Sequence, residues 1–417
     1  MDIWHIRGER RLEGTCFVQG SKNATLPIIA ASIISPAKTE LMNVPQLRDV
    51  DAALRILRHL GCTAEQRQSE VFIDSTYLSA CAIPNALMEE MRSSVIFMGA
   101  LLARCGEARL SLPGGCQLGK RPIDLHLAAL RQMGAEIDEN GTEIYCRAAK
   151  LKGAVIELPF PSVGATENIM LAACAARGRT IIKGAAREPE ITALQEYLRA
   201  MGADMSGAGT DTVIIEGFTA SKRAVCRIIP DRIAAATIAC ATAAVGGNVE
   251  MRGVAPEHFS TVLYFLNQAG CDIISNNRSV RVKSTGKLKA PGEIITEPYP
   301  GFPTDAQPVL MAALLKAEGR TMITENIFEN RYRQVPELRR LGADIITEGR
   351  RAEIWGVACL HGTALNATDL RGGAAMIVAG LAADGETVIF DDGHIPRGYD
   401  RFDARLRALG ADIFLEY

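Results

Sequence analysis

The sequence has no pair of cysteines in Cys-x-x-Cys spacing, no long apolar run and no excess of one charge, and each absence excludes a class of protein. Its eleven cysteines follow neither a zinc-site pattern nor a disulfide framework. No stretch approaches the roughly 18 apolar residues that cross a membrane. Lys and Arg number 46 against 48 Asp and Glu, which disfavours general binding to nucleic acid or to an anionic membrane.

The N-terminal segment MDIWHIRGERRLEGT lacks the apolar core of a secretory signal. Because the cysteines show no disulfide pattern either, we expect a reducing compartment and a cytoplasmic location. The chain has 417 residues, of which 48% are hydrophobic. At about 150 residues per domain, this length suggests two or three domains with sizeable cores.

A sixfold internal repeat spans the chain. The string Leu-x-x-(Leu/Met/Ala)-Gly-(Ala/Cys) occurs six times, and consecutive copies are 68 to 73 residues apart. Its glycines are Gly61, Gly134, Gly202, Gly270, Gly342 and Gly410. This regular spacing indicates six copies of one structural unit.

Each unit shows the same order of predicted elements. An apolar helix rich in small residues, such as 231–247, precedes a short alternating strand, an amphipathic helix and two further strands. The amphipathic helix ends at the repeated glycine, which suits the left-handed position after a helix C-terminus. The pattern is α-β-α-β-β, and the predicted fold class is α/β.

The last unit ends one strand short, and the N-terminus offers a match for the missing strand. WHIRGERRLEG resembles the segments that close the second and fifth units. Because an unpaired strand edge is a liability, we expect the two termini to lie in one sheet. The prediction is two three-repeat domains, residues 22–229 and residues 1–21 with 230–417. Two chain crossings, near Gly20 and Pro230, are expected to form a hinge beside a ligand-binding cleft.

Cations stand at the beginning of several of the apolar helices. A cation in the first turn opposes the helix dipole, at a cost of about 0.3–1 kcal/mol. Its repetition makes sense if an anion binds among the helix N-termini, although solvated surface cations are an alternative that the sequence leaves open. The residues are Lys22, Arg92, Arg232 and Arg371. Asp231 and Asp369, in the same segments, are explained adequately as helix N-caps.

Cys116 is the one cysteine to which the sequence assigns chemistry. It follows the glycine-rich segment 113–115 and is close to Lys120 and Arg121, and nearby cations lower the pKa of a thiol. Four other cysteines occupy alanine-like positions in helices or in the repeated string, so core packing explains them better. These are Cys62, Cys174, Cys240 and Cys271.

Nine segments carry a resemblance to a known family. They are GSKNATLP, SLPGGCQLGKRPIDLH, VGATEN, AAREPE, PDRI, FPTDAQ, FENR, ATDLR and HIPRGYD. Through them the whole chain resembles the enolpyruvyl transferases, and among these the family that acts on UDP-N-acetylglucosamine. The resemblance implies the inside-out α/β barrel, with two pseudo-threefold domains built from six repeats, which agrees with the repeat count.

The family transfers the enolpyruvyl group of phosphoenolpyruvate to the 3-hydroxyl of UDP-N-acetylglucosamine and releases phosphate, the first committed step of peptidoglycan synthesis. Addition and elimination through a tetrahedral intermediate need an acid, a base and cations. The resemblance implies that Cys116 is the acid, carried on a lid and alkylated by fosfomycin, and that Asp305 is the base. The implied phosphoenolpyruvate ligands are Lys22, Arg121 and Arg397 toward the phosphate, Arg331 and Arg371 toward the carboxylate, and also Asn23. Lys22 and Arg397 are also assigned to catalysis.

The resemblance also implies a nucleotide-sugar site. Its residues are Asn23, Arg92, Arg121, Pro122, Ile123, Asp124, Leu125, Pro161, Ser162, Val163, Gly164, Asp305 and Ile327. The turn 162–164 opens a helix, and its N–H groups suit a diphosphate, although a simple cap is a compatible reading. Neither a metal nor a cofactor is expected, and the partners are small-molecule substrates. Four acidic residues are expected to orient arginines or tie the domains together: Glu188, Glu190, Asp231 and Glu329. His126 is left open between a structural and a catalytic role.

Two alternatives remain open from the sequence. The 5-enolpyruvylshikimate-3-phosphate synthases share the fold and the donor, but the Pro-Gly-Gly-Cys and Arg-Pro-Ile-Asp-Leu-His runs favour the nucleotide-sugar family. The second alternative is a catalytically silent paralogue that only binds UDP-N-acetylglucosamine. The presence of Cys116, Asp305 and Lys22 disfavours this alternative. Departures from the family pattern, at Gln334 and at 372–373, touch no proposed chemical group.

Overall fold

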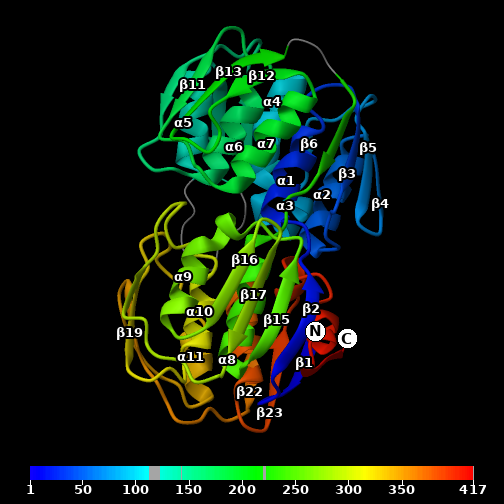
Figure 1. Ribbon diagram of the computed structural model, residues 1–417. Helices are drawn as coiled ribbons and strands as arrows, with labels where there is room; N and C mark the ends of the chain where they lie inside the picture. Colours follow the sequence, from blue (N-terminus) through cyan, green and yellow to red (C-terminus); the bar gives the residue numbers. More distant parts are fainter. Residues whose placement is uncertain (112–122, 142, 219–221, 417) are drawn as a thin grey trace. The chain divides into compact units, whose positions relative to one another are not determined.

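The computed structural model describes residues 1–111, 123–141, 143–218 and 222–416, and these form two compact units. We call residues 20–229 the N-terminal unit, and residues 1–19 with 230–416 the C-terminal unit (Figure 1). Every helix in these ranges is too short or too polar to span a lipid bilayer.

Each repeat builds one mixed sheet, so the described residues form six four-stranded sheets. The strand after the first helix pairs antiparallel with the last strand of the repeat, which pairs antiparallel with the strand after the second helix. A short strand lies parallel to the first strand at the remaining edge. The predicted α-β-α-β-β order is therefore present, with an additional edge strand that the sequence did not indicate.

The strand order of each sheet runs from the parallel edge strand to the opposite edge. In the N-terminal unit, the first sheet has the order β14 (Ala224–Arg227), β3 (Lys38–Met42), β5 (Glu70–Asp74), β4 (Thr63–Arg67). The second has the order β6 (Ala82–Ile83), β7 (Glu107–Ser111), β9 (Glu143–Arg147), β8 (Glu136–Asn140). The third has the order β10 (Val155–Glu157), β11 (Thr180–Lys183), β13 (Thr212–Phe218), β12 (Ala203–Ser206). In the C-terminal unit, one sheet has the order β2 (Leu12–Phe17), β15 (Gly247–Arg252), β17 (Ser279–Ser284), β16 (Asp272–Asn276). The next has the order β18 (Glu293–Ile295), β19 (Arg320–Thr324), β21 (Arg351–Trp355), β20 (Asp344–Glu348). The last has the order β22 (Ala364–Asn366), β23 (Glu386–Asp391), β1 (Asp2–Arg7), β24 (Asp412–Glu416).

The edge strands close each unit into a ring of three repeats. Each edge strand follows the hairpin of one repeat and joins the sheet of the next: β6 pairs with β7, and β10 pairs with β11. The third returns to the beginning, because β14 pairs with β3. The C-terminal unit repeats this order with β18, β22 and β2. Each unit therefore has pseudo-threefold symmetry.

The first helix of each repeat lies at the centre of its unit, inside the sheets. In the C-terminal unit, the central helices pack against one another and are almost wholly buried. They are α8 (Arg232–Val245), α10 (Gln307–Ala313) and α12 (Leu370–Leu381). Their N-terminal counterparts are α1 (Lys22–Ala31), α4 (Phe97–Cys105) and α6 (Val163–Ala173). Apolar helices enclosed by sheets define the inside-out α/β barrel.

The second helices are amphipathic and end at the repeated glycines. All six glycines have a left-handed backbone, with φ between 89° and 106°. Each directly follows a C-cap residue, as the sequence predicted. These helices are α2 (Arg48–His59), α5 (Asp124–Gln132), α7 (Pro189–Ala200), α9 (Ser260–Gln268), α11 (Val335–Arg340) and α13 (Phe402–Ala408). Further short helices are α3 (Asn85–Glu90), η1 (Arg92–Ile96), η2 (Pro256–Phe259) and η3 (Ile395–Arg397).

The two chain termini lie side by side in the C-terminal unit (Figure 1). Strand β1 pairs antiparallel with β23 on one side and with β24 on the other, so it is an inner strand of its sheet. The expectation that the N-terminus completes the last repeat is confirmed. Trp4 and Ile6 of β1 are buried in the core of this unit.

Candidate functional site

Two buried arginines of the C-terminal unit converge on one carboxylate. Arg331 Nη2 donates to Asp305 Oδ1 at 2.8 Å, and Arg371 Nη2 donates to Asp305 Oδ2 at 3.0 Å. The arginines are 2% and 5% exposed, whereas the Asp305 side chain is 28% exposed. We call these three residues the arginine cluster. Two guanidinium groups around one carboxylate leave a net positive charge, which favours a further anion.

Asp305 differs from the aspartates at the start of the other central helices. Asp231 accepts from the first N–H groups of α8, and Asp369 accepts from those of α12, so both are N-caps as expected. Asp305 does not cap α10, whose N-cap residue is Ala306. Its carboxylate is therefore held by the side chains of Arg331 and Arg371 and not by the helix N-terminus.

The loop before α11 places Arg331. Its Nε and Nη2 donate to the carbonyl oxygen of Thr304 at 3.1 and 2.9 Å, so the guanidinium is fixed beside the turn that carries Asp305. The Thr304 hydroxyl donates in turn to the buried Glu325 carboxylate, which also accepts from the N–H groups of Ile327 and Phe328. Ile327, assigned to the nucleotide sugar, is therefore linked to the arginine cluster through Glu325.

A chain of hydrogen bonds holds Arg371 from its other side. Its Nη1 donates to the Tyr399 hydroxyl at 3.4 Å, Tyr399 contacts the Thr237 hydroxyl at 2.9 Å, and Thr237 donates to the Ile233 carbonyl. Burial of the guanidinium acts to lower the pKa of Arg371, but Asp305, Tyr399 and Asp231 outweigh burial and raise that pKa above its ordinary value. Arg371 therefore remains charged.

Arg397 lies on η3, a turn that packs against the start of α12. The side chain of Ile395 fills the space beside Gly373, where an added Cβ would stand 2.7 Å from it. The Asp391 carboxylate accepts from the N–H groups of His394 and Ile395 and fixes the turn. Arg397 is half-buried, two residues before the Tyr399 that contacts Arg371.

In the N-terminal unit, Lys22 begins α1 and Asn23 follows it. The Lys22 ammonium lies 3.1 Å from Asp49 Oδ2, near the start of α2, and the two side chains are 14% and 3% exposed. The predicted cation in the first helical turn is thus present, and so are those at Arg232, the first residue of α8, and Arg371, the second of α12. Arg92 begins η1 rather than an α-helix.

Two of the segments assigned to the nucleotide sugar meet at His126. The Asn168 amide donates to His126 Nδ1 at 2.7 Å, and the other edge of the imidazole lies against Gly164, where a Cβ would stand 3.1 Å from it. His126 thereby brings the start of α5, with Ile123, Asp124 and Leu125, against the start of α6, with 161–164. Ser162 accepts from the Ala165 N–H, and the N–H groups of the first turn have no carbonyl partner within the helix.

His126 is expected to titrate far below the ordinary range of histidine. Burial lowers its pKa to about 4, although Asp124 acts to raise it. The folded protein therefore keeps the imidazole neutral, and stability decreases as the pH falls from about 6.5 to about 4, by up to about 3 kcal/mol. Histidine-selective NMR should show one resonance titrating near pH 4 that is missing from the His126→Gln variant. A His126 resonance titrating near pH 6.5 would contradict the buried, neutral assignment.

Three assigned residues, Cys116, Arg121 and Pro122, lie outside the described residues. The four cysteines assigned to packing are buried, as expected. Burial raises the pKa of Cys174 to about 12, and it raises those of Cys62 and Cys271 to about 11; neighbouring charges contribute less at Cys62, and a hydrogen bond with Ser284 acts to lower the pKa of Cys271. These thiols are inert at neutral pH.

The sequence missed several residues that support the candidate site. Asn168 lies within the VGATEN segment and Tyr399 within HIPRGYD, so their segments were identified but their contacts were not. Glu167 is buried, and burial with the neighbouring Glu190 and Glu188 raises its pKa well above the usual value. Glu325 carried no signal in the sequence, because an acidic residue after a strand is common.

Comparisons with known proteins agree on one class. The family model described as EPSP synthase (3-phosphoshikimate 1-carboxyvinyltransferase) matches residues 6–406. The enolpyruvyl transferase NikO of Streptomyces tendae superposes with a TM-score of 0.90 at 25% identity and covers 99% of this chain and 98% of its own. An EPSP synthase of Acinetobacter baumannii shares the fold, with a TM-score of 0.78 at 22% identity over 100% of both chains. The fold is that of the enolpyruvyl transferases, as the sequence predicted.

Relatives with higher sequence identity show which family of enolpyruvyl transferases the chain belongs to. A protein of Caldanaerobacter subterraneus subsp. tengcongensis named UDP-N-acetylglucosamine 1-carboxyvinyltransferase 2 is 45% identical over 413 residues, which are 99% of each chain. The chain belongs to the UDP-N-acetylglucosamine 1-carboxyvinyltransferase family, and it is an enolpyruvyl transferase.

Proposed function

We propose that the chain transfers the enolpyruvyl group of phosphoenolpyruvate to the 3-hydroxyl of UDP-N-acetylglucosamine and releases phosphate, as the first committed step of peptidoglycan synthesis. The observation that carries the proposal is the arginine cluster, in which Arg331 and Arg371 hold the Asp305 carboxylate in place. The cluster combines a fixed, ionised base with a positive charge for the donor's carboxylate.

The reaction consists of an addition and an elimination. In the addition, the sugar 3-hydroxyl loses its proton to Asp305 as its oxygen bonds to C2 of the donor, and Cys116 protonates the methylene carbon. In the elimination, the Cys116 thiolate takes a proton back from the new methyl group as the bond from C2 to the phosphate oxygen breaks, and the departing phosphate takes up the proton held by Asp305. The tetrahedral intermediate keeps both anionic groups, so fixed cations lower the barrier of both steps.

We assign the donor's phosphate to Lys22, Arg121 and Arg397, with Asn23 beside them, and its carboxylate to Arg331 and Arg371. The two clustered arginines are already buried and hydrogen-bonded, so little conformational entropy is lost when they bind an anion. Arginine suits a carboxylate because its N–H groups match two oxygens at once.

We assign the nucleotide sugar to the first turn of α6, to the start of α5, and to Asn23, Arg92, Arg121, Asp305 and Ile327. The turn 161–164 supplies N–H groups at a helix N-terminus, which favours a diphosphate. The substrates are small and soluble, and we propose a cytoplasmic location. We further propose that the two domains span residues 22–229 and residues 1–21 with 230–417.

An assay of phosphate release tests the function. Release with UDP-N-acetylglucosamine, and none with shikimate 3-phosphate, is expected. Release with shikimate 3-phosphate alone would replace the proposed acceptor, and no release with either acceptor would favour a silent binding protein. In the same preparation, mass spectrometry should locate a fosfomycin adduct on Cys116 and none on the exposed Cys105. An unmodified Cys116 would remove it from the acid role.

A further inference from the structure

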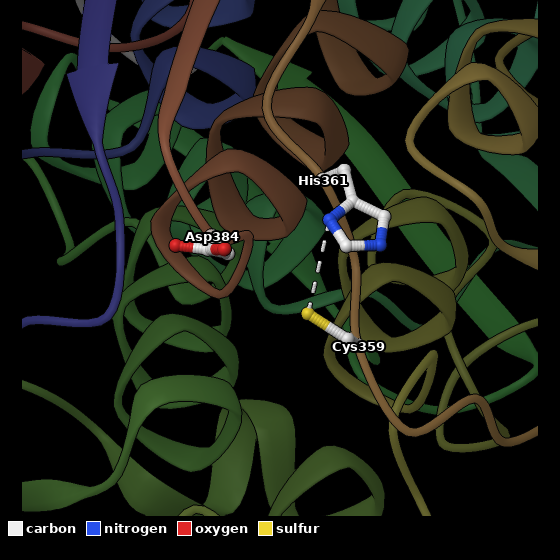
Figure 2. A group of neighbouring side chains, drawn as sticks. All are labelled: Cys359, His361 and Asp384. Atoms are coloured by element: carbon white, nitrogen blue, oxygen red, sulfur yellow. Dashed lines mark hydrogen bonds between the residues drawn. The ribbon is translucent and has the colours of Figure 1, made fainter.

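Three metal-ligating side chains gather in the C-terminal unit, away from the arginine cluster. Figure 2 shows Cys359 and His361 on one loop and Asp384 on another, with their polar atoms turned toward one another. The three ligand atoms all lie within 4.8 Å of one another, and Cys359 Sγ is 4.0 Å from His361 Nδ1. Among the described residues, this is the one group of its kind. His361 and Asp384 are exposed and Cys359 is half-buried, so an ion can reach them from solvent.

The backbone beneath the three side chains is fixed. His361 and Asp384 form a parallel bridge, in which the Gly362 N–H donates to the Asp384 carbonyl and the Asp384 N–H donates to the Leu360 carbonyl, both at 2.7 Å. Leu360 is fully buried between the two ligands of its loop. Because alternate residues of an extended segment point the same way, burying Leu360 turns Cys359 and His361 together toward the outside.

Equivalent bridges in two other repeats carry different residues. Lys152 pairs with Arg177 in one, and Lys289 pairs with Glu318 in the other. In both, a buried leucine precedes the bridge residue and another lysine precedes the leucine, giving Lys-Leu-Lys where this repeat has Cys-Leu-His. The fold therefore needs only the leucine and the bridge, and the thiol, imidazole and carboxylate together are particular to this repeat.

We propose that Cys359, His361 and Asp384 bind a divalent transition-metal ion, with Zn²⁺ as the best match. Thiolate, imidazole and carboxylate are the ligands that zinc uses in proteins, and a water molecule completes the tetrahedron. Zinc bonds of about 2.0–2.3 Å place neighbouring ligand atoms about 3.3–3.8 Å apart. The ligand atoms need to close by up to about 1.5 Å, within the reach of side-chain rotation. Binding releases the Cys359 thiol proton to solvent.

The ion binds away from the proposed chemistry. Arg371 is in the first turn of α12, whereas Asp384 follows the C-terminal end of that helix. A helix of 12 residues is about 18 Å long, so the ion touches no residue of the arginine cluster. Its effect is structural: it joins the loop 356–363 to the turn between α12 and β23.

Zinc titration of the tag-free protein tests the site. The wild-type chain, titrated with Zn²⁺ against a chromophoric chelator, should bind one ion that Cys359→Ser, His361→Gln and Asp384→Asn each weaken, by about 10- to 100-fold. The matched control is Cys105→Ser, which removes another exposed thiol and should leave the affinity unchanged. Replacing zinc by Co²⁺ should give a thiolate-to-cobalt charge-transfer band that disappears in Cys359→Ser.

The titration is repeated in a Cys116→Ser background, so that the Cys116 thiol cannot supply a ligand. Retained binding there supports the site. Undiminished affinity in Cys359→Ser would overturn the proposal, as would a cobalt band lost only with Cys105 or Cys116, or an affinity weaker than millimolar at neutral pH. Because these side chains are exposed or half-buried, all variants should fold, which circular dichroism checks. Zinc should also raise the melting temperature of the wild type and not that of Cys359→Ser.

Discussion

Asp305→Asn is expected to lower kcat by about 10²- to 10⁴-fold, the range in which a positioned general base contributes. Asparagine keeps the size of the side chain and one hydrogen-bond acceptor, but it cannot take the proton of the sugar hydroxyl. It also leaves Arg331 and Arg371 without their neutralising carboxylate. KM for phosphoenolpyruvate should therefore stay the same or fall while kcat falls. Steady-state kinetics with both substrates varied measures the two constants separately.

Asp403→Asn is the matched control for this variant. Half-buried Asp403 pairs with the exposed Arg407 within α13, so the same chemical change there removes one ion pair outside the arginine cluster. It should leave kcat and KM unchanged. If Asp305→Asn retained a kcat close to that of the wild type, the assignment of the base to Asp305 would be wrong, although the arginines could still bind the donor.

Arg371→Lys is expected to reduce kcat/KM for phosphoenolpyruvate by about 10- to 100-fold. Lysine keeps the charge, but it cannot bond to Asp305, to Tyr399 and to a substrate carboxylate at the same time. The loss of one charge-assisted hydrogen bond, worth about 1.5–3 kcal/mol, accounts for that range. The variant should be less stable as well, because the contact to Tyr399 is buried. Donor kinetics and chemical denaturation measure the two effects.

Arg339→Lys is the control that distinguishes a loss of donor binding in Arg371→Lys from a loss of stability. The Arg339 guanidinium donates through Nε and Nη2 to the Ile345 carbonyl, so it is another arginine held by a two-pronged hydrogen bond. Its substitution should reduce stability and leave KM for the donor unchanged. Equal values of kcat/KM for the donor in Arg371→Lys and in the wild type would show that Arg371 serves the fold alone.

Much of the fold could be predicted because the same structural requirement recurs in every repeat of the sequence. The glycine after each second helix needs a left-handed backbone, so one requirement repeats six times in the sequence. The pairing of β1 with β24 could be inferred because the last repeat lacked a strand. The edge strands could not be predicted. Strand β6 has two residues and β10 has three, which are too few to show an alternating pattern. They exist because a neighbouring repeat offers a strand edge.

The candidate site shows the same limit. Asp231, Asp305 and Asp369 stand in similar segments before central helices, and the sequence alone treats them alike. Two of them cap helices, and the third is held by arginines 26 and 66 residues away in the chain, a difference that depends on distances between loops. The sequence likewise left His126 open between a structural and a catalytic role, and it gave no sign of the burial and the bond to Asn168 that the structure shows.

The position of β1 constrains how the chain is made. Strand β1 is synthesised well before its partners β23 and β24, which follow it by about 380 and 410 residues. The described residues of the N-terminal unit all lie between residues 20 and 229, so a nascent chain can complete that unit early. The sheet that contains β1 cannot be completed until residue 416 has been added. Until β23 and β24 are made, β1 lacks the two strands that pair with it, so we expect chaperones to protect its apolar residues Trp4 and Ile6 during translation.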